Sequence, residues 1–268
     1  MSKYETDFND YSNKYLSEHN KNLSFEAILA IERKKQVLKS LNKYKHTHIL
    51  EIGCGLKPLF QYCEYKYYAI VEPCYEFIKH AKKLAEGRDN INIIHGYMEK
   101  VYEKLLEYNF DFIILSSLLH EVPYPEKLLQ SIYQVCKKDT IVHINVPNVY
   151  SFHRLLAYEM GYIKSIFEKS TMEIKFQRHT QFNKQLLFKM IEDNSFQILS
   201  YGTYFIKPLT NKQMEEIIYQ NIVNKDIIKG LEKIIKYMPD LGCEMFVDVK
   251  IDVSDPPKYQ TLKYHTTI

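Results

Sequence analysis

The chain has 268 residues, 46% of them apolar, which is enough to bury the core of one elaborated domain. Its 36 basic and 33 acidic residues give a net charge of +3 without a basic cluster, which disfavours nucleic acid as a partner. Five cysteines without a Cys-x-x-Cys pair indicate neither a disulfide framework nor a metal site. The chain has neither a signal-peptide core nor an apolar run near the roughly 18 residues of a membrane span, so we expect a cytoplasmic protein.

Two helices are predicted before the first strand. Apolar residues recur at near-helical spacing between residues 5 and 20, and Ser24 is expected to cap a second helix that ends near Leu41. Residues 48–52 then form a short apolar run that is typical of a buried parallel strand.

The first strand is followed by a turn with two glycines. Gly53 and Gly55 can adopt backbone angles closed to other residues and carry no side chain, so a ligand could lie directly on the main chain. Glu51, at the end of the strand, could accept hydrogen bonds from a cationic or hydroxylated ligand. A tight turn with a purely structural role is the alternative.

This stretch resembles motif I of the class I S-adenosylmethionine (SAM) methyltransferases, an acid followed by Gly-x-Gly-x-Gly. Lys57 stands where the family has its third glycine. A dinucleotide-binding oxidoreductase is the competing interpretation, but its fingerprint requires glycine at Pro58 and would set Glu51 against a pyrophosphate of like charge. The resemblance implies SAM as the cofactor. It also implies that residues 1–45 form a helical lid.

In such a lid, Tyr11 and Tyr15 are candidates to contact the cofactor. The alternative is that they pack on the edge of the domain.

The second and third strands end in further candidate residues. Strand 67–71 leads to Glu72 and Pro73, and an acid about 20 residues beyond the glycine turn is placed to accept both hydroxyls of a ribose. After a helix at 74–86 and a strand at 91–94, Tyr97 and Met98 are candidates to sandwich the adenine ring. Ordinary core packing is the alternative for both side chains.

A fourth strand at 110–115 leads into residues 116–129, which resemble motif IV of the same family. Ser116 and His120 lie in this region. If the acceptor is a hydroxyl, a histidine with a pKa near neutrality is the expected base, with His120 best placed and His153 and His179 as rivals. A structural or solvent-exposed role is the alternative for each. The Pro-Pro-aromatic and Pro-Cys motifs of nucleobase methyltransferases are absent here.

After a helix at 126–136 and a strand at 140–146, residues 146–156 resemble methyltransferases of bacterial surface-glycan and lipid-precursor pathways. We interpret residues 148–180 as an insertion at the ligand edge of the sheet that selects the acceptor. Its candidate substrate-binding residues are Asn148, Tyr150, His153, Arg154, Arg178 and His179.

The remaining pattern predicts a helix at 182–193, a strand at 196–206, a long helical stretch at 211–236 and a strand at 243–251. The expected fold is therefore α/β and Rossmann-like, with seven strands, mostly parallel, and an antiparallel edge. The domain spans residues 46–252, and residues 253–268 form a tail.

The function that follows is transfer of a methyl group from SAM to a small polar acceptor. The expected acceptor atom is an oxygen of a sugar, a nucleotide-linked precursor or a phosphoryl or phosphoramidate group of a capsule precursor. Two alternatives stay open, namely N-methylation of an amino sugar or other amine, and a non-catalytic SAM-binding regulatory protein. The oligomeric state is not predicted.

Overall fold

A computed structural model describes residues 24–175, 178–254 and 256. The helix expected at 5–20, with Tyr11 and Tyr15, lies outside these residues, as does most of the tail. None of the helices so described is both long and apolar enough to cross a membrane.

The described residues form one sheet of seven strands. The strands are β1 (His48–Ile52), β2 (Tyr67–Glu72), β3 (Ile91–His95), β4 (Phe112–Ser116), β5 (Ile141–Pro147), β6 (Phe196–Tyr204) and β7 (Glu244–Ile251). Their order is β3-β2-β1-β4-β5-β7-β6. Only β7 runs against its neighbours, because it lies between β5 and β6 and pairs antiparallel with both. This arrangement confirms the predicted fold class.

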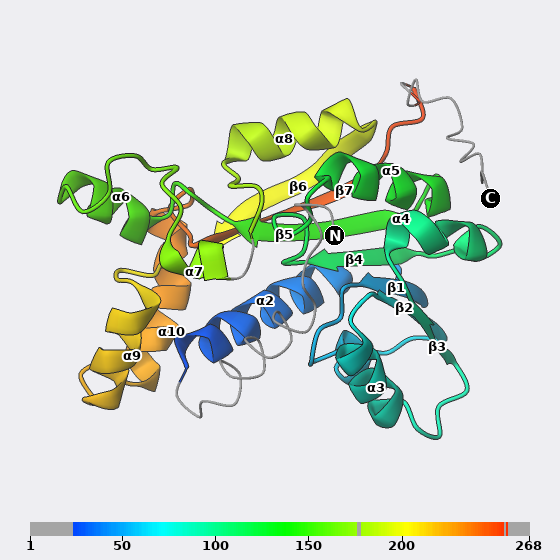
Figure 1. Ribbon diagram of the computed structural model, residues 1–268, viewed down its shortest axis with the longest axis horizontal. Coiled ribbons are helices and arrows are strands. Elements are labelled where there is room, and N and C mark those ends of the chain that lie inside the picture. Colours follow the sequence, from blue (N-terminus) through cyan, green and yellow to red (C-terminus); the bar gives the residue numbers. More distant parts are fainter. Residues whose placement is uncertain (1–23, 176–177, 255, 257–268) are drawn as a thin grey trace.

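Helices cover both faces of the sheet (Figure 1). One face carries α2 (Phe25–Leu41), η1 (Leu59–Gln61) and α3 (Tyr75–Leu84). The other carries α4 (Met98–Val101), η2 (Tyr102–Leu105), α5 (Pro125–Val135) and α8 (Lys184–Asp193). As predicted, Ser24 caps α2, where its side chain accepts a hydrogen bond from the Ala27 amide.

Consecutive residues of the central strands enter opposite cores. In β1, Ile49 packs with α2 and α3, whereas Leu50 packs with α4 and α5, and both are fully buried. Side chains alternate between the faces of a strand, so a strand covered on both faces is apolar throughout. This is why the central strands could be located from short apolar runs.

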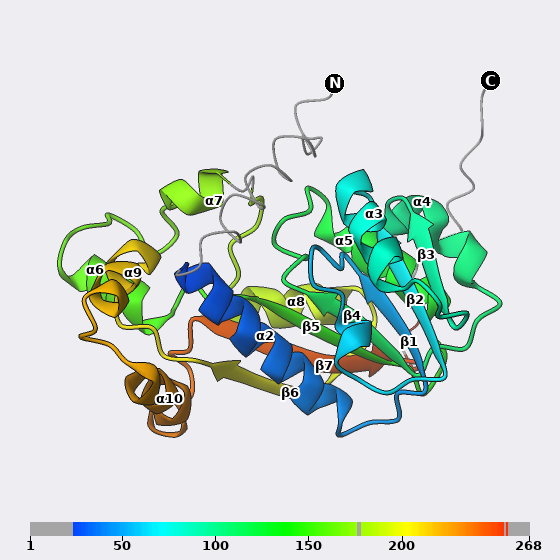
Figure 2. The same cartoon turned by 90° about the horizontal axis from the view of Figure 1, so that it is seen from below.

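Two insertions gather at one end of the sheet, beside the N-terminal end of α2 (Figures 1 and 2). The first, after β5, contains α6 (Phe152–Glu159) and α7 (Thr171–Lys175). The second, between β6 and β7, contains α9 (Asn211–Tyr219), α10 (Lys225–Lys233) and η3 (Ile234–Tyr237). Because β5 and β6 both end here, the insertions lie over the carboxyl edge of the sheet.

The second insertion corrects the expectation of one long helical stretch at 211–236. Asn221 has a φ of 58°, which ends α9, and the Asn224 side chain accepts hydrogen bonds from the Asp226 and Ile227 amides to begin α10. Asparagine tolerates the left-handed region and is a strong N-cap, so two asparagines in four residues were the signal for a break.

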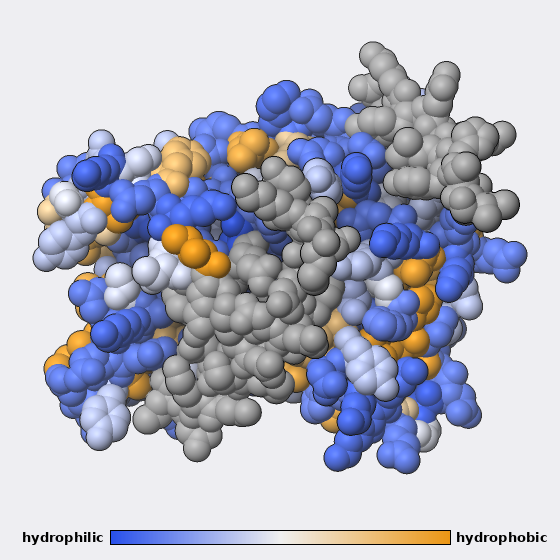
Figure 3. All heavy atoms as spheres, viewed as in Figure 1, coloured by the Kyte–Doolittle hydropathy of each residue, from blue (hydrophilic) through white to orange (hydrophobic). Residues whose placement is uncertain are grey.

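Large exposed apolar side chains occur mostly on the two insertions, among them Tyr162, Tyr219 and Tyr237. On the face shown in Figure 3, hydrophobic residues lie singly or in small groups among hydrophilic ones. Such scattered exposure is ordinary for a folded surface.

At the opposite, amino edge of the sheet, Asp111 joins the starts of β1 and β4. Its Oδ2 accepts hydrogen bonds from the amides of Thr47 and His48, both at 3.0 Å, and Oδ1 lies 2.8 Å from the ammonium of Lys45. Partial burial raises the pKa of Asp111, but these partners outweigh it and lower the pKa to about 2.

We expect Asp111→Ala to lower the free energy of unfolding by about 1–3 kcal/mol, because two backbone amides lose a charged acceptor. Urea denaturation at pH 7 measures the loss, with the exposed Asp139→Ala as the matched control. The folded pKa lies below the usual 3.8, so the stabilising effect is present above about pH 4 and disappears as the pH falls towards 2. Equal unfolding free energies for wild type and Asp111→Ala at pH 7 would contradict this role.

Candidate functional site

The candidate residues of the first four strands all lie at the carboxyl edge of the sheet, where ligands of open α/β sheets bind. The turn after β1 is tight. Gly53 and Gly55 have φ values of 74° and 54°, and a Cβ added to Gly53 would lie 2.9 Å from Cδ2 of Leu118. The positive φ favours glycine at Gly53, and the side chain of Leu118 from the loop after β4 packs directly against it.

Lys57 does not need to be a glycine. Its φ is not positive, and Pro58 follows with a φ of −55° into η1. The turn therefore leaves through an ordinary conformation, and the departure from the third glycine of the motif is accommodated by the backbone.

Glu51 is turned towards the protein. Its carboxylate accepts a hydrogen bond from the Leu59 amide at 3.0 Å and another from the Tyr68 hydroxyl at 2.8 Å. Burial raises its pKa to about 7, although both hydrogen bonds act in the opposite direction. These contacts favour a supporting role for Glu51, which fixes the turn, over the direct ligand contact that we expected.

Glu72 faces the glycine turn. Its Oε2 accepts a hydrogen bond from the Gly55 amide at 3.2 Å, and its Oε1 accepts one from the Cys74 amide at 2.9 Å. Burial raises its pKa to about 7 despite these bonds. A carboxylate has more acceptor capacity than two amides fill, so this position can still receive hydroxyl donors. Beside it, the Pro73 carbonyl lies 3.0 Å from Nε2 of His95.

The loop after β3 separates the two residues that we expected to hold an adenine. Tyr97 is 38% exposed, and the ammonium of Lys100 lies 5.2 Å from its ring centroid. Met98 is only 2% exposed and belongs to the core on the α5 face. The structure thus corrects the expected role of the Met98 side chain to core packing, whereas Tyr97 remains a candidate.

The end of β4 is held by Asn145 of the neighbouring strand. Ser117 has a φ of 56°, and its amide donates to the side-chain oxygen of Asn145 at 2.9 Å, while the Ser116 hydroxyl also bonds the Asn145 side chain. Left-handed backbone at a serine is uncommon and needs such support. The turn that it produces directs the following residues over the sheet edge.

His120 follows this turn and is only 2% exposed. Within the described part of the chain, neither ring nitrogen has a hydrogen-bond partner, and Oε1 of Glu121 lies too far from Nε2, at 3.6 Å, to accept one. Burial, with the guanidinium groups of Arg178 and Arg33, lowers the pKa of His120 well below its usual range. The expectation of a pKa near neutrality was therefore wrong, and the imidazole is neutral.

The first insertion closes over His120. The amides of His179 and Thr180 both donate to the His120 carbonyl, at 2.9 and 3.2 Å. Burial also lowers the pKa values of His153 and His179, so a near-neutral pKa does not single out either rival. His153 further contacts the Ser151 hydroxyl through Nδ1, at 3.1 Å.

Arg154 has a structural role, contrary to its expected role in binding an anionic substrate. Its guanidinium donates to the carbonyls of Ile166 and Glu168 and lies 3.1 Å from a carboxylate oxygen of Glu173. Most of its five N–H groups are thus used within the insertion. Arg154 ties α6 to the loop before α7.

Asn148 is also structural. Its amide group donates to the carbonyls of Asp240 and Gly242, both at 3.0 Å, and its oxygen accepts from the Tyr150 amide. These bonds join the start of the first insertion to the end of the second, so Asn148 has little capacity left for a substrate. Tyr150 is exposed and packs edge-on against Phe167.

A buried group of charges that the sequence interpretation missed lies beneath the insertions. Arg33 of α2 pairs with Glu26 at 2.7 Å and with Glu244 of β7 at 2.9 Å. The positive charges of Arg178 and Lys207 also lower the pKa of Glu26. The members of this group therefore come from α2, β7 and both insertions. The sequence could have indicated one member, Lys207, because it follows β6. This strand runs in the same direction as β5, so both end at the carboxyl edge of the sheet.

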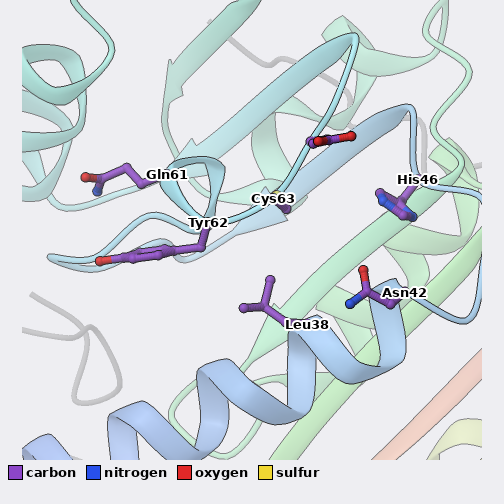
Figure 4. Close-up of a pocket in the computed structure, with 7 residues that line it drawn as sticks. Leu38, Asn42, His46, Gln61, Tyr62 and Cys63 are labelled. Atoms are coloured by element: carbon purple, nitrogen blue, oxygen red, sulfur yellow. The ribbon is translucent and has the colours of Figure 1, made fainter.

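A separate groove of about 510 Å³ lies between α2 and the loop after η1 (Figure 4). It is lined by Leu38, Asn42, His46, Gln61, Tyr62, Cys63 and Glu64. His46 precedes β1 and Glu64 precedes β2, so the groove extends to the amino edge of the sheet. It is not part of the candidate site.

Residues 50–144 match the family described as "Methyltransferase domain". No curated protein sequence matches the chain. Among solved structures, a possible histamine N-methyltransferase from Thermotoga maritima is 16% identical, with a TM-score of 0.59, over 91% of this chain and 98% of that one. A putative sarcosine dimethylglycine methyltransferase from Galdieria sulphuraria is 11% identical, with a TM-score of 0.55, over 83% and 86%.

The chain is also similar to a plantazolicin methyltransferase in complex with SAH, at 12% identity and a TM-score of 0.54, over 82% of this chain and 85% of that one. Likeness at this identity shows the fold. The matched domain runs from β1 into β5 and contains the glycine turn, Glu72 and His120. Residues 50–144 are therefore a methyltransferase domain, the chain has the Rossmann-like fold of SAM-dependent methyltransferases, and SAM is the cofactor that this domain implies.

Proposed function

We propose that the enzyme methylates an oxygen of a small polar acceptor, which binds between the loop after β4 and the two insertions. The observation that carries this proposal is His120, a neutral, buried imidazole without a hydrogen-bond partner in the described residues. A buried polar group is normally paired, so an unpaired one beside the expected methyl position is a candidate to meet a substrate hydroxyl.

Glu72, the glycine turn and Tyr97 are the residues that we propose hold SAM, with Glu72 on the ribose hydroxyls. The fit rests on two glycines with positive φ and a carboxylate that faces them. Bound SAM supplies an activated methyl group on a sulfonium. The protein must therefore mainly hold the acceptor oxygen in line, an effect worth roughly 7–11 kcal/mol in favourable cases.

His120 is proposed to accept the hydrogen bond of the acceptor hydroxyl and then its proton. Burial, with the positive charges of Arg178 and Arg33, disfavours a positive charge on the ring, so complete proton transfer before methyl transfer is costly. We therefore propose that His120 first orients the oxygen lone pair and takes the proton as the oxygen becomes positive.

N-methylation of an amine is the second candidate, since two proteins of the same fold are named for an amine acceptor. A protonated amine would need a free carboxylate. Glu26 and Glu244 are both bonded to Arg33, although Oε2 of Glu244 has no hydrogen-bond partner among the described residues, and Glu121 lies 3.8 Å from Arg178. The Lys207 ammonium adds a positive charge that no described carboxylate meets at ion-pair distance. This balance supports an oxygen acceptor, such as a sugar, nucleotide-linked or phosphoryl-bearing capsule precursor.

The test is to incubate the enzyme with methyl-labelled SAM and fractionated cell extract and to follow SAH formation. A labelled product identified by mass spectrometry reveals the acceptor atom. A methylated nitrogen would overturn the oxygen proposal in favour of the second candidate.

We expect Glu72→Gln to weaken SAM binding about tenfold or more, because one or two charge-assisted hydrogen bonds of about 1.5–3 kcal/mol are lost. The wild-type pKa of about 7 also predicts that binding near pH 7 releases protons, since ribose hydroxyls favour the ionised carboxylate. Affinity should accordingly fall as the pH drops below 7.

Calorimetry in buffers with different ionisation enthalpies measures both effects, with exposed Glu76→Gln as the control. Wild-type affinity and proton release in a folded Glu72→Gln variant would remove Glu72 from the cofactor site.

We expect His120→Leu to reduce turnover by about 10²–10⁴-fold while SAM affinity stays within twofold of wild type. Leucine is chosen because it removes the acceptor nitrogen and leaves no unpaired polar atom. Only the neutral ring can accept a proton, and its pKa is lowered, so the wild-type rate should show no His120 titration between pH 8 and 6.5.

The control is His80→Leu on α3, away from the carboxyl edge. Near-full turnover by a folded His120→Leu variant would show that the oxygen needs no base at this position.

A further inference from the structure

Lys207 is a buried cation without a matching anion. It follows β6 at the carboxyl edge and is only 7% exposed. Its ammonium donates to the side-chain oxygen of Asn211 at 2.5 Å, and no described carboxylate lies within ion-pair distance of it. Lysines are rarely this buried unless they are paired, because removing the charge from water is costly.

Two carboxylates that influence Lys207, those of Glu26 and Glu244, are bonded to Arg33 at 2.7 and 2.9 Å, although Oε2 of Glu244 has no hydrogen-bond partner in the described part of the chain. Burial lowers the pKa of Lys207, and the negative charges of both carboxylates oppose this shift. Arg178 carries the same charge as Lys207 and lowers its pKa. The ring of Phe25, 5.9 Å from the ammonium, adds an apolar wall. A free anion would therefore be stabilised here more than a further cation.

Lys207 belongs to the same buried region as His120. The Cys243 amide donates to the Phe205 carbonyl at 2.9 Å and the Asn148 amide donates to the Cys243 carbonyl at 3.0 Å, which joins the segment of Lys207 to the insertion that covers His120. Besides burial, the positive charge of Arg178 lowers the pKa of both His120 and Lys207. The region is thus bounded by the loop after β4, both insertions and the N-terminal turn of α2. An acceptor that reaches His120 therefore lies at the same carboxyl edge of the sheet as Lys207, whereas Arg178 is balanced by Glu121 at 3.8 Å.

We propose that the acceptor carries an anionic group, a carboxylate or a phosphoryl group, and that Lys207 binds it while the hydroxyl to be methylated faces His120. This inference rests on the proposed function. The ammonium has two N–H groups left after its bond to Asn211, and both can donate to anionic oxygens. The class of substrate is a small hydroxylated acid or phosphomonoester, in place of a neutral sugar.

The experiment titrates the SAH-loaded enzyme with inorganic phosphate and, separately, with acetate, at constant ionic strength maintained with chloride. Calorimetry measures the dissociation constants for wild type, Lys207→Met, Lys207→Arg and Lys212→Met. Methionine keeps the length of the side chain without its charge, and Lys212 is an exposed lysine of the same insertion.

We expect at least one of the two anions to bind wild type and Lys212→Met with a millimolar dissociation constant. Lys207→Met should weaken that binding tenfold or more, and Lys207→Arg should restore part of it. Phosphate alone indicates a phosphoryl acceptor, and acetate alone indicates a carboxylate. Failure of wild type to bind either anion, or equal binding by Lys207→Met, would overturn the proposal.

SAM titration and turnover in the same preparations keep the two proposals apart. If Lys207→Met binds SAM normally and its turnover with active extract is unchanged at every dilution, the methyltransferase assignment stands and the anion site falls. If the anions bind as expected but no extract supports turnover, the anion site stands and the proposed O-methylation loses its support.

Discussion

One buried chain of hydrogen bonds connects the core of the sheet to the candidate site. Asp248 of β7 accepts from Nδ1 of His143 at 2.6 Å, Nε2 of His143 lies 3.3 Å from the Asn145 amide group, and Asn145 holds the Ser117 amide. His143, Asn145 and Asp248 are completely buried, and unpaired groups there would cost about 1–3 kcal/mol each. The requirement for pairing fixes the His143 tautomer and the left-handed turn at Ser117.

That turn determines where the rest of the site lies. It directs Leu118 against Gly53, so the loops after β1 and β4 meet at the proposed cofactor position, and it presents the His120 carbonyl to the first insertion. Since Asp248 and Asn145 belong to β7 and β5, the site depends on the antiparallel strand between β5 and β6. A substitution within these buried hydrogen bonds should therefore disturb the loop after β4 more than the glycine turn after β1.

The elements that depend on local pattern could be predicted from the sequence. Apolar runs located the strands, and the spacing of Gly53, Glu72 and His120 located the cofactor edge, because parallel strands end side by side. The roles of side chains could not be predicted in the same way. Arg154 has the right charge and segment for a substrate contact, but its guanidinium is used by carbonyls 12 and 14 residues further along the chain. Such hydrogen bonds depend on the conformation of a loop, which the spacing of apolar residues in the sequence does not predict.

The same reason explains why the buried charges beneath the two insertions were not predicted from the sequence. Its charges come from segments far apart in sequence, so Arg33 and Glu244, 211 residues apart, form one pair. Arg33 bonds one oxygen of Glu26 and one of Glu244, and none of the described carboxylates lies within ion-pair distance of Lys207. The first insertion covers His120, whereas the second supplies Lys207, and Asn148 joins the two. If the acceptor binds as we propose, its recognition depends on both insertions, and exchanging either one alone between related enzymes should fail to transfer specificity.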